Sequence, residues 1–134
     1  MFYADGVPAG SFGCWRTGFV QTWSAKPRHE MTVTQRMDLA QRIEAVRRQR
    51  EADKRQRHAD AAAAAAIRWA AATPASDAHP YLLRKGVRAH GLRVDAAGNL
   101  LVPMRDTVEY LHSLQEIHPD GFKHFMIGGR VKGC

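Results

Sequence analysis

One stretch of the chain, residues 28–73, contains neither glycine nor proline, and this feature constrains the fold more than any other. Its composition favours a helix, because alanine, arginine, glutamine and glutamate are strong helix formers. We predict a helix over residues 34–72, with Thr32 or Thr34 as its N-cap. A helix of 39 residues is about 58 Å long, which exceeds the diameter of a small domain. Part of it must therefore project from the domain or bridge two parts of the chain.

The side-chain pattern along this helix changes twice. Apolar residues first recur at intervals of three and four, as on a helix face that packs against a core. These residues are Met37, Ala40, Ile43 and Val46. Residues 47–60 then contain only two apolar side chains, both alanine, whereas residues 61–66 are all alanine. A helical segment that is polar all round is exposed to solvent, bound to a partner or stabilised by charge pairs. The available pairs are Glu44–Arg48, Glu51–Arg55 and Asp53–Arg57.

Short β-strands are predicted on both sides of the helix, because turn signals there alternate with apolar and aromatic segments. The predicted strands are residues 2–4, 10–15 and 19–24 before the helix, and about 92–94, 100–104, 109–118 and 122–126 after it. A second, short helix is expected after Asp77, ending at Gly86. The fold class is therefore α+β: an N-terminal antiparallel β-meander, one long basic helix, and a small C-terminal antiparallel sheet with a short helix. We place the three domains at residues 1–27, 28–73 and 74–134.

The charge of the chain points to a polyanionic partner. There are 20 Lys and Arg residues against 13 Asp and Glu, a net charge of +7, and 15 of the 20 cations are arginine. Arginine suits phosphates and carboxylates because its planar guanidinium forms two parallel hydrogen bonds. More than half of the excess lies on the long helix, where nine cations oppose five anions over residues 34–68. The leading partner class is DNA, single-stranded or duplex, and an acidic protein surface is the second.

The candidate DNA-binding residues lie in two places. Phosphate contacts are assigned to the middle of the long helix, at Arg47, Arg48, Arg50, Lys54, Arg55 and Arg57. Trp15 and Arg16, in the aromatic N-terminal zone, are the candidates for stacking on exposed bases. The other aromatic residues of that zone are interpreted mainly as core. The polar helix is also able to join two copies of the chain as an oligomer.

The motifs of a self-contained enzyme are absent from the sequence. It has no G-x-S-x-G, no phosphate-binding P-loop and no C-x-x-C zinc signature, so we predict no catalytic residue, no metal and no cofactor. His112 or His118 is expected to neighbour His124 across a turn, but two histidines on a sheet are more often exposed polar residues than ligands. The carboxylates Asp95, Asp106 and Asp120 fall at predicted turns, where aspartate is common for backbone reasons, and are not read as catalytic.

Two further features bear on where the chain works. No window approaches the roughly 18 consecutive apolar residues of a membrane span, so we expect no membrane association. The two cysteines, Cys14 and Cys134, are far apart and form no disulfide framework, which favours the reduced cytoplasm.

Three segments resemble one protein family. They are HPYLLRKGVRAHGLRVDAAGNLLVPMRD (residues 79–106), LHSLQEIHPDGFKHFMIGGRVKGC (111–134) and DGVPAGSFGCWRTGFVQTWSAKP (5–27). Together they resemble the region before the TOPRIM catalytic domain in TraC-like plasmid and phage DNA primases, including those of the primase-helicase type. The family also tends to carry a charged, alanine-containing helix between such segments. It has a glycine-containing turn where this chain has DTVEY (residues 106–110), so we expect a different hairpin there.

The resemblance implies a role but no catalytic residue. TOPRIM chemistry uses a glutamate and an Asp-x-Asp pair that hold divalent metal, and neither motif is found here. We therefore expect the middle portion of a primase without its catalytic domain. The leading hypothesis is a non-catalytic module of a mobile-element primase, active in plasmid or phage replication and conjugation, that binds DNA through the basic helix. The alternative is a stand-alone primase remnant that binds a protein, for instance as an inhibitor of a host defence or replication complex.

Overall fold

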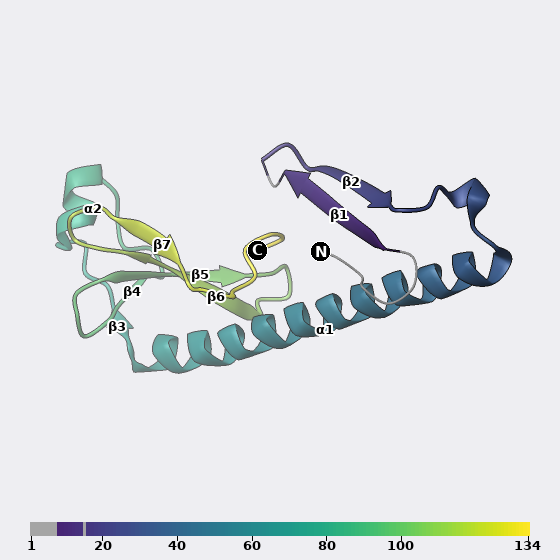
Figure 1. The fold of residues 1–134 in the computed structure, drawn as a ribbon. Coiled ribbons are helices and arrows are strands. Elements are labelled where there is room, and N and C mark those ends of the chain that lie inside the picture. Colours follow the sequence, from purple (N-terminus) through teal and green to yellow (C-terminus); the bar gives the residue numbers. More distant parts are fainter. Residues whose placement is uncertain (1–7, 15) are drawn as a thin grey trace. The chain divides into compact units, whose positions relative to one another are not determined.

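The computed structural model describes residues 8–14 and 16–134, and it divides the chain into two compact units, Met1–Arg50 and Glu51–Cys134 (Figure 1). The boundary falls inside the long helix α1 (Val33–Ala71), so each unit contains part of it. The combination of antiparallel sheets with one long and one short helix is an α+β fold, as predicted from the sequence.

The first unit begins with a two-stranded antiparallel hairpin. Strand β1 (Ala9–Cys14) pairs with β2 (Phe19–Ser24), and Gly18 adopts a positive φ of 70° in the turn between them. Both strands were predicted within one residue of their ends. The strand predicted over residues 2–4 lies outside the described residues. A short 3₁₀ helix, η1 (Arg28–Glu30), follows β2.

Helix α1 has 39 residues, as predicted, although it begins and ends one residue earlier than expected. The Thr32 hydroxyl accepts a hydrogen bond from the Gln35 backbone N–H (3.2 Å), and the Gln35 side chain accepts one from the Thr32 N–H (3.1 Å). This reciprocal capping box satisfies two donors that a helix N-terminus leaves open, and it confirms Thr32 as the N-cap. At the other end, the Arg93 guanidinium donates to the carbonyl oxygens of Trp69 (2.6 Å) and Ala72 (3.4 Å).

The second unit contains a five-stranded antiparallel sheet with the strand order β3-β4-β5-β6-β7. The strands are β3 (Thr73–Pro74), β4 (Arg93–Val94), β5 (Leu100–Arg105), β6 (Leu111–Ile117) and β7 (Lys123–Phe125). Four of them were predicted, with longer limits for all but β5, which extends one residue beyond its predicted end. The sequence analysis missed β3, a two-residue strand directly after α1.

Both faces of this sheet are covered by helix side chains. Successive residues of each strand point to opposite faces, so each strand contributes to both contacts. On one face, Leu101 and Leu114 cluster with Ala65, which belongs to the C-terminal part of α1, and with Ala72, which follows that helix. On the other face, Leu100 clusters with side chains of the short helix α2 (Pro80–Lys85). The small side chain of alanine lets the helix backbone approach the sheet closely.

Helix α2 begins after His79, not after Asp77 as predicted. The His79 ring accepts a hydrogen bond from the Tyr81 N–H (3.2 Å), and Pro80 occupies the first helical position, where its missing N–H leaves nothing unsatisfied. Asp77 instead accepts a hydrogen bond from the Ala89 N–H (2.7 Å). The predicted C-terminus is confirmed, since Gly86 adopts the left-handed conformation there.

The β5–β6 turn contains one residue in an unfavourable backbone conformation. Glu109 has a φ of 64°, a left-handed conformation that disfavours residues with a Cβ. Asp106 supports the turn, because its carboxylate accepts hydrogen bonds from the N–H groups of Val108 (3.0 Å) and Tyr110 (3.1 Å). The hairpin therefore contains a strained residue where glycine fits without strain.

Candidate functional site

All six cations that were predicted to contact phosphates are exposed on α1. They are Arg47, Arg48, Arg50, Lys54, Arg55 and Arg57. Every residue from 51 to 57 is exposed, so this segment contributes no side chain to a core. The polar middle of the helix therefore lies in solvent, as its composition predicts.

Two of these cations continue the helix face that packs against the sheet. Side chains three or four residues apart share a face of an α-helix, and Lys54, Arg57, Ala61 and Ala65 follow one another at such intervals. Ala61 and Ala65 are buried, whereas Lys54 and Arg57 are exposed. Across the part of the chain that the structure describes, no ion pair engages Lys54, Arg55 or Arg57, so the predicted Glu51–Arg55 and Asp53–Arg57 pairs do not form. Their charges are available to an external partner.

Two further cations, in the first unit, share one carboxylate. Glu44 lies 3.2 Å from Arg48 and 4.0 Å from Arg47, measured between the ionic N and O atoms, which confirms the predicted Glu44–Arg48 pair. Both arginine side chains are more than three-quarters exposed. An exposed pair of this kind contributes about 0–1 kcal/mol. It therefore presents little obstacle to contact with a phosphate.

The N-terminal hairpin presents aromatic side chains on one face. In its register Cys14 opposes Phe19, Phe12 opposes Gln21 and Gly10 opposes Trp23, which places the three rings on the same side. Phe12 and Phe19 are more than half exposed, so neither is the core residue that the sequence analysis favoured. The predicted stacking residue Arg16 is exposed in the adjoining turn, and its neighbour Trp15 lies outside the described residues.

A second cluster of charged side chains lies in the second unit, on the sheet face that α1 covers. Glu116 of β6 is buried and forms an ion pair with Arg68 of α1. Arg68 also lies 3.4 Å from the carboxylate of Asp95, in the β4–β5 turn. His124 of β7, which opposes Glu116 in the sheet register, approaches the same Glu116 oxygen to 3.4 Å. One guanidinium and two carboxylates thus occupy the contact between helix and sheet.

The pKa values in this cluster reflect that pairing. The hydrogen bond to Glu116 raises the pKa of Arg68, and the same bond holds the pKa of Glu116 below its ordinary value although burial opposes this. Burial raises the pKa of Asp95, but hydrogen bonds from Asn99 and Ala97 outweigh it, so this pKa is also lowered. Both carboxylates therefore carry a negative charge at neutral pH.

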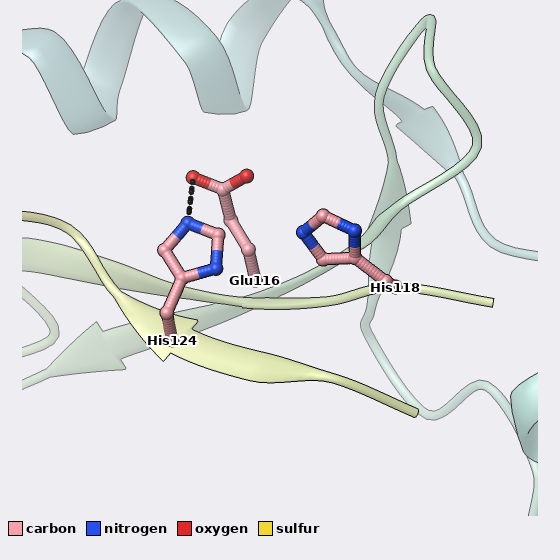
Figure 2. Close-up of side chains that lie close together, drawn as sticks. All are labelled: Glu116, His118 and His124. Atoms are coloured by element: carbon pink, nitrogen blue, oxygen red, sulfur yellow. Dashed lines mark ion pairs between the residues drawn. The ribbon is translucent and has the colours of Figure 1, made fainter. Parts of the chain in front are cut away.

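Two histidine rings lie beside Glu116 (Figure 2). His118 follows β6 and His124 belongs to β7, and their ring centroids are 5.5 Å apart. The prediction that His118 or His112 neighbours His124 is therefore confirmed for His118. Nε2 of His118 and Nδ1 of His124 are both buried and form no hydrogen bond with any described residue. Such atoms are uncommon, because nearly all buried polar groups find a partner.

His112, on β6, has other partners. Nε2 of His112 lies 2.8 Å from Oδ2 of Asp106 and 3.5 Å from a guanidinium nitrogen of Arg130. The hydrogen bond to His112 is the main cause that lowers the pKa of Asp106. The predicted turn roles of Asp95, Asp106 and Asp120 are confirmed, since each carboxylate accepts backbone N–H groups of its own turn.

The sequence analysis did not single out Glu116 or Arg68. A signal for Glu116 existed, because strand alternation places it on the same face as His118, and a tight Pro-Asp-Gly turn brings the following strand alongside. Nothing in the sequence indicated that Arg68 meets this face, because that contact depends on how α1 packs on the sheet.

Comparisons of the sequence with protein-family models and with curated proteins, and of the structure with solved structures, find no match. Within residues 8–14 and 16–134, no helix combines the length and the apolar character needed to cross a membrane.

Proposed function

We propose that this chain binds nucleic acid through the exposed basic segment of α1, as a non-catalytic module related to mobile-element DNA primases. The observation that carries the proposal is the exposure of residues 51–57, which include Lys54, Arg55 and Arg57 and no large apolar side chain. Over residues 47–57 six cations oppose two carboxylates. A helix with such an excess of positive charge attracts a phosphate backbone irrespective of base sequence.

The aromatic face of the hairpin supports single-stranded DNA as the preferred form. Exposed rings such as Phe12 and Phe19 stack on unpaired bases, and each stacked base contributes about 1–3 kcal/mol. Arg16 lies in the turn next to these strands and offers a further contact to phosphate. In this proposal α1 contacts the phosphates and the hairpin stacks on the bases.

The resemblance to TraC-like primases supplies the context of this proposal. It suggests a role beside a TOPRIM catalytic domain in plasmid or phage replication, with the α+β unit as a support. We further propose that the chain works in the cytoplasm, where the exposed thiols of Cys14 and Cys134 stay reduced, and that α1 can join two copies of it.

A second function, binding to an acidic protein, is favoured by the apolar character of the same hairpin. Phe12, Phe19 and Val20 are large apolar side chains exposed on one small hairpin, and such surfaces often mark protein interfaces. In this alternative the basic helix pairs with carboxylates of a host protein and the hairpin packs against its apolar surface. The chain then acts as an inhibitor of a defence or replication complex.

A binding titration at two salt concentrations separates the two functions. We expect fluorescence anisotropy to show binding to labelled single-stranded DNA and to duplex DNA of unrelated sequences. Affinity should fall steeply with salt, by about one unit of log–log slope for each phosphate contact. Absence of salt-dependent binding to either form would overturn the nucleic-acid proposal. Co-purification with a protein that DNA does not displace would support the alternative.

A further inference from the structure

We propose that Glu116, His118 and His124 form a binding site for a divalent transition metal, of which Zn²⁺ is the best match. This site is independent of the proposed nucleic-acid function. It also differs from the expectation that the sequence analysis gave, which was that these histidines serve only as polar surface residues.

The first argument is the position of the donor atoms. One ligand atom from each of the three side chains lies within 4.8 Å of the other two. A tetrahedral Zn²⁺ site has bonds of about 2.0–2.2 Å, which separates its ligand atoms by about 3.4 Å. The ligand atoms need to approach one another by up to about 1.4 Å, through rotation of the two rings and the carboxylate. Two of the three donors come from adjacent strands of one hairpin, so the sheet already fixes their backbones.

The second argument concerns one ring nitrogen of His118 and one of His124, which are free to bind a ligand. Nε2 of His118 and Nδ1 of His124 are buried without a hydrogen-bond partner among the described residues. In Figure 2 these two nitrogens face one another across the space beside Glu116. A neutral imidazole binds metal through an unprotonated nitrogen, and a nitrogen that accepts no hydrogen bond is free to do so. The same metal ion would satisfy both atoms.

The third argument concerns Glu116, which supplies an anionic oxygen beside the two rings. The contacts from Arg68 and from Nε2 of His124 (3.4 Å) both go to its Oε1. One carboxylate oxygen of Glu116 is the third ligand. A fourth position stays open for water.

The charge around the site also favours a cation. Arg68 is paired with two carboxylates, Glu116 and Asp95, so these three side chains together carry a charge of −1. A divalent ion therefore enters a locally negative site in spite of the adjacent guanidinium.

Zinc titration of the full-length chain tests the site. Metal-free protein competes with a chromogenic zinc chelator near neutral pH, for the wild type, for H118N/H124N and for the control H29N/H90N. The control removes two exposed histidines and leaves both cysteines, as does the test variant. We expect one Zn²⁺ bound equally by wild type and control. In H118N/H124N the affinity should fall by more than the roughly hundredfold that the loss of a ligand-orienting partner causes.

A second pair of variants tests the carboxylate. Glu116→Gln should weaken zinc binding by about tenfold or more, because it removes the charged ligand. Asp95→Asn is the matched control: it removes the other carboxylate that faces Arg68 and leaves the imidazoles and Glu116 in place, so it should change the affinity little. Equal effects of the two substitutions would show that general electrostatics, and not ligation by Glu116, governs binding.

Wild-type protein alone can also decide the proposal, in case a variant fails to fold. Nuclear magnetic resonance of the imidazole C–H groups should show that saturating Zn²⁺ shifts the signals of His118 and His124 and leaves that of His112 unchanged. The proposal is wrong if zinc binds H118N/H124N as tightly as the wild type, or if the signals of His118 and His124 do not respond.

Discussion

Two segments of α1 in the second unit differ sharply although they are parts of one helix. Residues 61–71 pack on the sheet through buried alanines such as Ala65, whereas residues 51–57 are exposed without exception. Lys54 and Arg57 continue the helix face of Ala61 and Ala65, so the difference does not come from the direction in which the side chains point. It comes from residue type, since the buried segment has small apolar side chains and the exposed one has charged ones. The helix thus attaches to the sheet with one segment and presents charge with the other.

The substitution with the largest expected effect changes a residue of the sheet that packs against the C-terminal segment of α1. Leu101 is fully buried against Ala65 and Ala72. Leu101→Ala should lower the free energy of unfolding by about 2–5 kcal/mol, because it leaves a cavity in this contact. Ile67→Ala changes an exposed side chain of the same helical segment and should stay within about 0.5 kcal/mol. Urea unfolding measures both, and equal effects would show that the alanine face is not the attachment.

A smaller effect tests the alanines themselves. Ala65→Leu places extra carbon atoms in a contact with no free space, and we expect a loss of about 1–3 kcal/mol. The matched control is Ala63→Leu, at an exposed position two residues away, which should lie within about 0.5 kcal/mol of the wild type. Thermal unfolding monitored by circular dichroism compares them. A tolerated Ala65→Leu would contradict the close approach of helix and sheet.

A third prediction concerns a substitution outside α1, which is expected to change the stability by a smaller amount and to raise it. Glu109→Gly should raise the stability by about 0.5–1 kcal/mol, because glycine accepts the left-handed conformation that disfavours glutamate. The exposed contact between Arg105 and Glu109 (3.9 Å) is weak and its loss should matter little. Glu109→Ala removes the same carboxylate and keeps the strain, so it should not stabilise. Equal stabilities of the two variants in urea would refute a backbone cause.

The smallest effect on stability belongs to the exposed segment. K54Q/R55Q/R57Q should change the free energy of unfolding by no more than about 0.5 kcal/mol, since these side chains are exposed and glutamine is a good helix former. Urea unfolding beside Leu101→Ala provides the comparison. A loss of several kcal/mol in the free energy of unfolding would mean that these cations stabilise the fold and are not available to an external partner.

Local patterns predicted most of the fold. The absence of glycine and proline over residues 28–73 predicted α1 within one residue. Alternation between turn signals predicted six of the seven strands found in the described residues. The errors came from contacts that local pattern does not contain. Strand β3 exists because Thr73 and Pro74 reach β4, and the N-cap of α2 is His79 because Pro80 fixes where that helix begins.

The candidate sites were predictable to different degrees. The exposed cations of α1 follow from composition alone, because a polar segment of helix has nothing to bury. The neighbouring His118 and His124 follow from the hairpin turn between them. The ion pair between Glu116 and Arg68 could not be predicted, since it depends on which face of α1 meets the sheet.

The central claim, that the exposed segment of α1 contacts phosphates, is tested most directly by the salt dependence of DNA binding in two charge-matched variants. K54Q/R55Q/R57Q should reduce the log–log slope by about two to three units for single-stranded or duplex DNA, and similarly for unrelated sequences. K85Q/R88Q/K132Q, which removes three exposed cations elsewhere in the same unit, should leave the slope near that of the wild type. If both variants reduce the slope equally, net charge and not this helix governs binding, and the account is wrong.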